Sequence, residues 1–314
     1  MVNLSDEAQK VGEKNSTKPL AEKYRVRQHP HPHVGVNLTN RCNLRCKGCL
    51  AGLDTEFHIP DKGYISEKTI DEIIKQLKTK VEGGFRGRVV ITGGEPSLHP
   101  DFIRFSQKFA EAKLPLNIST NLTWINPNLS PNKQPRLASL MKILKYPHVR
   151  IVVPMDFMHL EACPQLPKII KYFSDLSIKN GLKYGQDYSF CRIAKNLRSI
   201  AESAVICGFE INEQNVLVVI ADWRPYLFLS RLDDVINFLQ ISPDGKVYQN
   251  MYSMAYGKKP LGDVNKLGLI VNNFAKKIAN RKGKLLGQFN PKADWNAQGK
   301  ELLKIYRHLK NSQD

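Results

Sequence analysis

The sequence predicts an α/β fold, and two kinds of segment that alternate along the chain support this prediction. Short apolar runs rich in Val and Ile recur between residues 34 and 222, and each has the length of a buried strand. The segments between them are longer, and their apolar residues recur with the spacing of an amphipathic helix. This alternation is typical of parallel βα units with right-handed crossovers, and about six units fit in the span. Six units can form either an open doubly wound sheet or an incomplete barrel.

The expected elements follow one another without long gaps. Strands are expected at 34–38, 88–92, 116–119, 149–154, near 183–190 and at 215–221. Helices are expected after Ser66 and over 101–112, 136–145, 166–180 and 195–206. The first helix has the clearest boundaries, because Ser66 can cap its N-terminus and Gly83 and Gly84 can end it.

The pattern changes after residue 222. Residues 239–250 predict a hairpin that turns near Gly245, and helical patterns follow at 267–280 and 299–310. At the other end, the polar N-terminal segment lacks periodicity and ends in alternating His and Pro. The expected organisation is an N-terminal arm over 1–33, a core domain over 34–235 and a C-terminal extension over 236–314.

Composition excludes several classes of protein. Of the 314 residues, 42% are hydrophobic, which suits a folded globular chain. No apolar run reaches the roughly 18 to 20 residues that cross a bilayer, and the N-terminus has no apolar signal segment, so we expect a cytoplasmic protein without a membrane span. Lys and Arg number 47 against 29 Asp and Glu, for a net charge of +18. This excess favours an acidic partner such as RNA, DNA or an acidic peptide, although a lysine-rich surface with no partner explains it equally well.

The six cysteines are too sparse for a disulfide scaffold, yet Cys42, Cys46 and Cys49 lie close together. On a helix their spacing would place them on one face as small buried side chains. However, the segment leaves a strand directly, and the residues between the cysteines are mostly polar, basic or Gly, which makes a poor helix. In a loop, the same spacing lets three thiolates surround one metal centre.

Two kinds of metal centre remain open at this point. A structural zinc site needs four ligands, and His58 or His33 would have to supply the fourth. An iron–sulfur cubane with one iron free of protein ligands suits three thiolates better, because the free iron can bind a substrate or cofactor. Arg45 and Lys47 would favour the thiolate state of the cysteines.

Residues able to support chemistry follow each of the first four expected strands. The cysteine triplet follows the first strand, residues 93–96 follow the second, residues 119–121 follow the third and Asp156 follows the fourth. Because the carboxyl ends of parallel strands share one edge of a sheet or barrel, we expect all four groups to lie on the same rim.

The CxxxCxxC spacing of the triplet resembles the signature of the radical S-adenosylmethionine (SAM) enzymes. A second motif of that family is matched by Gly93, Gly94, Glu95 and Pro96. The resemblance implies that the three cysteines hold a [4Fe–4S] cluster, that the amino and carboxylate groups of SAM chelate the fourth iron, and that the GGE segment lines the SAM amino group. Two glycines permit close approach of the backbone to a ligand, and a carboxylate suits an ammonium group. The alternative is a plain strand-to-helix turn with Glu95 as the acid at the helix N-terminus.

Weaker matches extend the resemblance along the rim. Ser119 and Asn121 lie where the family's third strand reaches the SAM ribose or carboxylate. Arg192 lies where a cation could meet the SAM carboxylate, although a surface arginine is at least as good an interpretation.

The chain departs from the family pattern at two positions. Gly48 precedes the third cysteine, where the family often has an aromatic residue beside the adenine. Pro154 replaces the serine of a fourth-strand Ser-x-Asp pattern, so the contact of that hydroxyl with SAM is in question, whereas Asp156 is retained. Asp156 and nearby His159 are the candidates for proton transfer or substrate contact.

Residues 241–264 resemble the start of a SPASM or twitch domain, in which many related peptide-modifying enzymes carry auxiliary clusters. No cysteine occurs after Cys207, so an auxiliary cluster of the usual kind cannot form. Cys163, Cys191 and Cys207 match no cluster pattern, and we interpret them as buried thiols, with a hydrogen-atom donor as the alternative.

The resemblance implies an incomplete (β/α)6 TIM-like barrel with a small C-terminal cap. It also implies an enzyme that cleaves SAM reductively to a 5′-deoxyadenosyl radical, with an external one-electron reductant of the flavodoxin or ferredoxin type. The SPASM-like remnant favours a peptide or protein substrate, and RNA or a nucleotide-derived small molecule is the alternative. From another class, a non-catalytic basic protein with a structural zinc site also fits the triplet.

Overall fold

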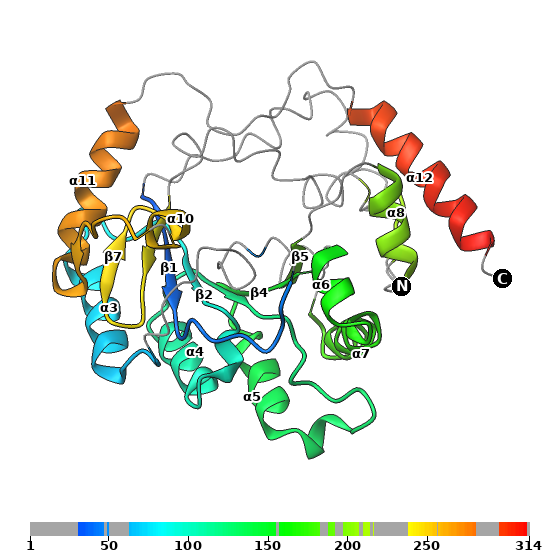
Figure 1. The fold of residues 1–314 in the computed structure, drawn as a ribbon, viewed down its shortest axis with the longest axis horizontal. Helices are drawn as coiled ribbons and strands as arrows, with labels where there is room; N and C mark the ends of the chain where they lie inside the picture. Colours follow the sequence, from blue (N-terminus) through cyan, green and yellow to red (C-terminus); the bar gives the residue numbers. More distant parts are fainter. Residues whose placement is uncertain are drawn as a thin grey trace, which may run out of the picture.

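The computed structural model describes the greater part of the chain, as one sheet with helices packed against it (Figure 1). The described residues are 31–46, 49, 63–154, 157–182, 188–191, 197–206, 210–213, 216, 238–255, 257–280 and 295–312.

The sheet has eight described strands in the order β5-β4-β3-β2-β1-β6-β7-β8. The strands from β5 to β6 in this order are mutually parallel, and β7 and β8 continue the sheet in antiparallel fashion. Their bounds are β1 His33–Asn37, β2 Val89–Thr92, β3 Leu116–Ser119, β4 Val149–Pro154, β5 Tyr188–Cys191, β6 Phe238–Ile241, β7 Lys246–Tyr248 and β8 Gly262–Asp263. Within the described residues, β5 and β8 are the two ends of the sheet and do not pair with each other.

Helices occur where the periodicity predicts them, and the short helices α6 and α10 occur where none was predicted. The α-helices are α3 Glu67–Thr79, α4 Phe102–Glu111, α5 Pro135–Ile143, α6 Phe157–Ala162, α7 Leu166–Lys179, α8 Leu197–Ile206, α10 Met251–Ala255, α11 Leu267–Asn280 and α12 Trp295–Asn311. Short 3-10 helices are η1 Pro96–Leu98, η2 Pro131–Lys133 and η4 Val264–Lys266. The predicted cap of α3 is confirmed, because the hydroxyl of Ser66 accepts a hydrogen bond from the N–H of Thr69 at 3.1 Å.

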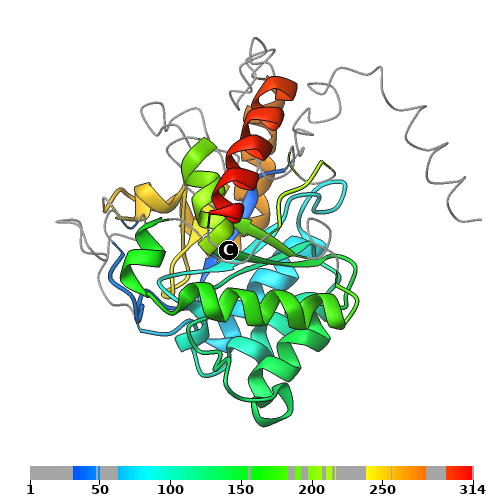
Figure 2. The same ribbon diagram turned by 90° about the vertical axis from the view of Figure 1, so that its right-hand side faces the viewer.

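One face of the parallel strands forms the hydrophobic core. Its side chains are buried and apolar: Val34, Val36, Val89, Ile91, Leu116, Ile118, Val149, Ile151 and Val153. Large side chains from α4 and α7, such as Phe102, Phe109 and Phe173, are buried in the same core. Figures 1 and 2 show α3, α4, α5 and α7 on this side of the sheet.

The opposite face of the parallel strands, here called the inner face, has a different composition. Its positions are His33, Gly35, Asn37, Val90, Thr92, Asn117, Ser119, Arg150, Val152, Pro154, Ser189, Cys191, Phe238 and Gln240, with Arg88 just before β2. Most of these residues are small or polar. Crossover helices on one face only are typical of a barrel and not of a doubly wound sheet, so the fold is an incomplete α/β barrel.

The C-terminal part contributes a strand to this sheet. β6 pairs in parallel with β1, with Leu239 opposite Val34. The hairpin predicted after it is confirmed, because β6 and β7 are antiparallel and the N–H of Gly245 donates to the carbonyl of Ser242 at 2.9 Å. The sheet therefore continues across the domain boundary expected near residue 235, which local patterns could not reveal.

The end of the expected N-terminal arm is anchored to the sheet. The Nδ1 atom of His31 accepts a hydrogen bond from the N–H of Arg86 at 3.0 Å, and Nδ1 of His33 accepts one from the N–H of Arg88 at 3.1 Å. His33 therefore begins β1 and is held on the β2 side of the sheet. His58, the other histidine considered for zinc, lies outside the described residues.

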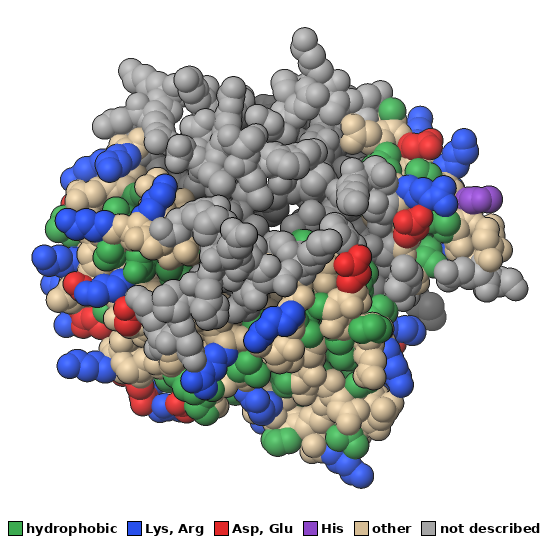
Figure 3. Space-filling model, in the orientation of Figure 1, with side chains coloured by type: hydrophobic (Ala, Val, Ile, Leu, Met, Phe, Trp, Pro, Cys, Tyr) green, Lys and Arg blue, Asp and Glu red, His purple; other side chains and the backbone are tan. Residues whose placement is uncertain are grey.

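Several remaining features complete the described structure. α8 and α12 lie side by side in both ribbon views (Figures 1 and 2). The strand expected at 215–221 falls almost wholly outside the described residues. Among the described helices, none is long and apolar enough to cross a membrane. In Figure 3, Lys and Arg are spread over several elements of the visible described surface with Asp and Glu among them, so this view shows no single basic patch.

Candidate functional site

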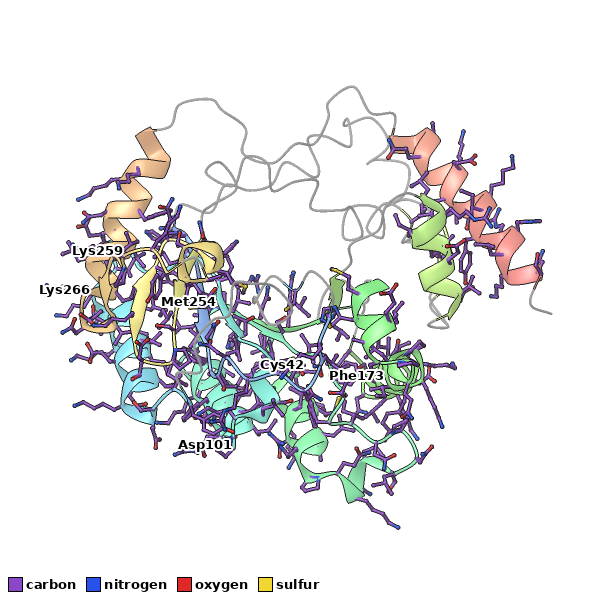
Figure 4. All side chains as sticks on the ribbon, viewed as in Figure 1. Cys42, Asp101, Phe173, Met254, Lys259 and Lys266 are labelled. Atoms are coloured by element: carbon purple, nitrogen blue, oxygen red, sulfur yellow. The ribbon has the colours of Figure 1, made fainter. Side chains whose placement is uncertain are left out.

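The cysteine loop leaves β1 at the rim formed by the carboxyl ends of the strands. The described part of the loop, residues 42–46 and 49, contains no helix, so the helical alternative for the triplet is wrong. Cys46 is buried, and Cys42 and Cys49 are half-buried. The N–H of Cys49 donates to the carbonyl of Cys46 at 3.1 Å, which folds the loop back on itself. Cys42 lies near the centre of the described body, away from Lys259 and Lys266 at its edge (Figure 4).

The three thiols influence one another electrostatically. The pKa of the Cys42 thiol is raised to about 11, mainly because the thiol is buried. The N–H of Leu44 donates to its Sγ and lowers the pKa, whereas Glu95, Cys49 and Cys46 raise it. A positively charged centre beside the thiols would reverse this balance and favour thiolates.

The chemistry of the donor set fits a metal cluster, although the sulfur atoms are not in the arrangement of a closed site. Within the described residues, no group of three His, Cys, Asp or Glu side chains is gathered closely enough to hold a metal ion. Three thiols on one loop are nevertheless the ligands that iron–sulfur clusters use. Because Nδ1 of His33 is occupied by the N–H of Arg88, a zinc site would have to use the other ring nitrogen of His33 or a different ligand.

Gly93 and Gly94 let the end of β2 pack directly against the chain that enters the cysteine loop. The N–H of Gly94 donates to the carbonyl of Thr39 at 2.9 Å, and the N–H of Glu95 donates to the carbonyl of Arg41 at 2.8 Å. A Cβ on Gly93 would lie 2.2 Å from the Thr39 oxygen, and one on Gly94 would lie 2.2 Å from the Arg41 oxygen. Only glycine fits at either position, so the GGEP segment fixes the backbone immediately before Cys42.

Glu95 joins the ends of β2 and β3. Its side chain is 1% exposed. Its Oε1 atom accepts hydrogen bonds from the hydroxyl of Thr120 at 2.6 Å and from the N–H of Ser97 at 3.0 Å, and Oε2 accepts one from the N–H of Asn121 at 2.7 Å. Burial raises the pKa of this carboxyl group, and the hydrogen bonds act in the opposite direction. Glu95 therefore caps η1, which starts at the buried Pro96, and braces the loop after β3.

The loop after β3 is connected to the cysteine loop in turn. The amide Nδ2 of Asn121 donates to Oδ1 of Asn43 at 3.1 Å, and Nδ2 of Asn43 donates to the hydroxyl of Thr123 at 2.6 Å. Leu122 is buried with a φ of +60°, a strained backbone conformation that the surrounding hydrogen bonds hold in place. Ser119 is half-buried on the inner face at the end of β3. Three strand ends are thus joined around the cysteine loop.

A second polar cluster supports β1 from the side of β6. Nε2 of Gln240 donates to Oδ1 of Asn37, and Nδ2 of Asn37 donates to Oδ1 of Asn40 at 3.1 Å and to the sulfur of Met254 at 3.8 Å. Met254 is labelled in Figure 4 beside the β6–β7 end of the sheet. The Oε1 atom of Gln240 is buried and has no hydrogen-bond partner among the described residues. The chain of contacts from Gln240 to Asn40 leads to the start of the cysteine loop.

The remaining predicted site residues follow β4 and β5. Pro154 is half-buried at the end of β4, and His159 is half-buried on α6, a short helix that the sequence pattern did not predict. Asp156 and Arg192 lie outside the described residues. The structure therefore brings the cysteine loop, the GGEP segment and the loop after β3 together, and it places His159 on the helix that follows the next strand end.

Sequence reasoning missed several residues that build this site. Asn43 carries contacts between loops, and Asn37, Asn40 and Gln240 form the second cluster. Thr120 was expected on the rim, but not as a hydrogen-bond partner of Glu95. The signal that could have found Asn37, Asn40 and Asn43 is their position, because each is a polar residue at the end of β1 or in the segment that follows it. Gln240 gave no such signal, since its partner is more than 200 residues away.

Comparison with known proteins gives the class to which this architecture belongs. Residues 36–173 match the family model of the Radical SAM superfamily. These residues, which run from β1 into α7, therefore form a Radical SAM domain, and the cofactors of that superfamily are a [4Fe–4S] cluster and SAM.

Curated relatives match over limited spans. The chain is 36% identical over 73 residues to GTP 3',8-cyclase of Listeria welshimeri, which is 23% of this chain and 20% of that protein. It is 35% identical over 100 residues to an S-adenosylmethionine-dependent nucleotide dehydratase of Flammeovirga pacifica, which is 32% of each protein. The match to a nucleotide dehydratase of Selenomonas ruminantium is 29% identical over 143 residues and covers 46% of that protein. The chain thus spans less than half the length of these curated relatives.

Solved structures are similar at low sequence identity. SuiB of Streptococcus suis bound to the precursor peptide SuiA has a TM-score of 0.49 at 14% identity, over 90% of this chain and 74% of that one. The anSMEcpe structure with bound AdoMet has a TM-score of 0.49 at 14% identity, over 89% of this chain and 98% of that one.

Proposed function

We propose that this chain is a radical SAM enzyme in which Cys42, Cys46 and Cys49 hold the [4Fe–4S] cluster. When bound and reduced, the cluster and SAM would supply a 5′-deoxyadenosyl radical that abstracts a hydrogen atom from the substrate. The electron would come from an external reductant of the flavodoxin or ferredoxin type. The observation that carries the proposal is the pair of backbone hydrogen bonds from Gly94 and Glu95, which place the GGEP segment against the start of the cysteine loop.

The chain's own residues would position the cofactors. The rigid contact between residues 93–95 and residues 39–41 supports the entry of the cysteine loop, and we assign the SAM amino group to the backbone side of the GGE segment. The Glu95 carboxylate would act mainly as a brace, because its oxygens already accept three hydrogen bonds from the chain. Ser119 and Asn121 would meet the polar end or ribose of SAM, and Asn121 also fixes Asn43 in the cysteine loop.

Beyond β4, Asp156 and His159 are assigned to the substrate side of the rim. His159 follows the end of β4 on α6, at the point where a substrate above the rim would meet the protein. We assign Asp156 and His159 to proton transfer or substrate contact, and Arg192 to an anionic group of SAM.

Two substrate classes are compatible with this site. A peptide or protein is favoured by the resemblance of residues 241–264 to a SPASM or twitch domain and by the net charge of +18, which suits an acidic segment. A nucleotide-derived small molecule is favoured by the relatives named GTP 3',8-cyclase and nucleotide dehydratase, which match within the core domain.

The metal content tests the proposal against the zinc alternative. Anaerobic reconstitution with iron and sulfide should give a brown protein with a broad absorption band near the violet and about four iron atoms per chain. Replacing Cys42, Cys46 and Cys49 by alanine should remove the colour. A colourless protein that retains stoichiometric zinc would overturn the enzyme assignment.

A further inference from the structure

The inner face has one end at the rim, and at its other end Arg88 and Arg150 lie on either side of β3. Arg88 immediately precedes β2, and Arg150 is the second residue of β4. Asn117 of β3 is the register partner of Arg150. It also accepts a hydrogen bond at its Oδ1 atom from Nη1 of Arg88 at 3.2 Å. The register partner of Asn117 on β2 is Val90, two residues after Arg88, so the three side chains form a diagonal group across three neighbouring strands, here called the arginine row.

The charges of the arginine row are not balanced within the described structure. Neither Arg88 nor Arg150 forms an ion pair with a described carboxylate, whereas Arg104, Arg198 and Arg307 each do. No inner-face position of the described parallel strands carries an acidic residue. The pKa of Arg88 is lowered, first because its side chain is largely buried and then because of the positive charge of Arg150.

Two neighbouring cations without a counter-charge favour an anionic ligand between them. Guanidinium groups bind phosphate and carboxylate oxygens through pairs of parallel hydrogen bonds. A phosphate carries roughly −1.5 to −2 charges near pH 7 and can balance two arginines, whereas a carboxylate carries only one. Arg150 is exposed, so a ligand can reach the row from solvent. The Nδ2 atom of Asn117 can add a further hydrogen bond, because its Oδ1 atom is the one that Arg88 uses.

We propose that Arg88, Asn117 and Arg150 bind a phosphate group of the substrate. This inference rests on the proposed function, which places the reacting part of the substrate at the rim, and it adds that the substrate extends from there along the inner face. Asn117 lies two residues before Ser119 on β3, so the arginine row is roughly 7 Å along the strand from the rim. A small phosphorylated molecule can span that interval with its phosphate on the row and its reacting carbon at the rim. The arginine row therefore supports the nucleotide-derived substrate class over the peptide class.

Calorimetric titration of the reconstituted protein tests the site with simple anions, without SAM or a reductant. Inorganic phosphate and pyrophosphate should bind saturably, and acetate should bind at least about tenfold more weakly. The Arg150→Gln variant should weaken phosphate binding by about tenfold or more. Lys145→Gln is the matched control, because Lys145 is an exposed residue just after α5 and the change in net charge is the same. It should alter the affinity less than about twofold.

Three results would overturn the inference: equal weakening by both substitutions, unchanged phosphate affinity in Arg150→Gln, or acetate binding as tight as phosphate binding. Failure of the proposed function gives a different result. If the protein cleaves SAM but does not bind phosphate, the phosphate-binding role of the arginine row is refuted and the enzyme assignment is not. A protein that binds phosphate through Arg150 but never forms 5′-deoxyadenosine refutes the enzyme assignment and leaves an anion site.

Discussion

The two ends of the inner face are stabilised in opposite ways. At the rim, Glu95 accepts two hydrogen bonds from the loop after β3 and one from the N–H of Ser97, and Asn121 and Asn43 connect the loop after β3 to the cysteine loop. At the far end, Arg88 donates to the amide oxygen of Asn117, and Arg150 is the register partner of the same residue. Neither arginine has a described carboxylate partner. The contrast indicates that the rim is a preformed scaffold whose polar groups are used internally, whereas the far end keeps its charges available for a ligand.

The tightest contact of the rim should be the most sensitive to substitution. In Gly94→Ala, the new Cβ would lie 2.2 Å from the Arg41 carbonyl oxygen, and backbone must move on one side. We expect a loss of about 3 kcal/mol or more in the free energy of unfolding, measured by urea denaturation.

Gly84→Ala is the control for this substitution. Gly84 has a φ of +76°, and a Cβ added there would have no neighbour within 4 Å, so alanine meets backbone strain but no collision. Its expected cost is about 1–2 kcal/mol. Equal losses at the two positions would show that the contact between the GGEP segment and the cysteine loop is not tight.

The next largest loss in the free energy of unfolding is expected from replacing the buried Glu95. Glu95→Ala leaves the hydroxyl of Thr120 and the N–H groups of Ser97 and Asn121 without their acceptor, so we expect a loss of about 2–3 kcal/mol in the same assay. The exposed Glu111 accepts one hydrogen bond from a neighbouring side chain, and Glu111→Ala should cost less than about 0.5 kcal/mol. A loss in Glu95→Ala no greater than in this control would refute the bracing role.

The connection between the two loops should be measurable as a coupling energy. A double-mutant cycle with Asn43→Ala and Asn121→Ala should give about 0.5–1 kcal/mol of interaction between the two sites. The coupling is expected to be small because the bond lies near the surface. Strictly additive effects would mean that the loop after β3 does not hold the cysteine loop.

His99 should give the smallest effect, as a dependence of stability on pH. Its Nε2 atom lies 3.0 Å from the carbonyl oxygen of Ile65, and its Nδ1 atom accepts from the N–H of Asp101 at 3.0 Å. Burial lowers the pKa of His99, so below about pH 6.5 the unfolded chain binds a proton that the folded chain does not. Stability should therefore fall as the pH drops below that value and be fully present above it.

The difference in unfolding free energy between wild type and His99→Gln should accordingly shrink between pH 7.5 and pH 5.5. Burial also lowers the pKa of His31, but His31 titrates in both proteins and cancels in the difference. A difference that does not change with pH would mean that His99 titrates alike in the folded and unfolded chains.

Local signals predicted the elements of the fold better than their assembly. The pattern gave β3 and β4 their observed bounds and gave α3 its Ser66 cap, because strand length, helical spacing and capping are properties of neighbouring residues. The hairpin near Gly245 was also visible locally. Pairing of β6 with β1 was not, since a parallel contact across about 200 residues leaves no trace in either segment alone.

The candidate site shows the same difference between features that local sequence signals predict and features that depend on assembly of the fold. The spacing of the cysteines and the GGEP motif identified the rim, and polar residues after strands pointed to Ser119 and Asn121. The role of Glu95 as a brace required the position of Thr120, and the arginine row required the register that sets Arg150 beside Asn117. Such contacts depend on strand order and register, which the sequence pattern leaves open.

Formation of 5′-deoxyadenosine tests the central claim most directly, namely that Cys42, Cys46 and Cys49 hold a cluster that cleaves SAM. The reconstituted protein should form it from SAM and dithionite under anaerobic conditions, and so should Cys163→Ala, a control at a half-buried cysteine outside the loop. The triple alanine variant of the loop should form none. Product from the triple variant, or none from a wild-type protein that contains the cluster, would contradict the account.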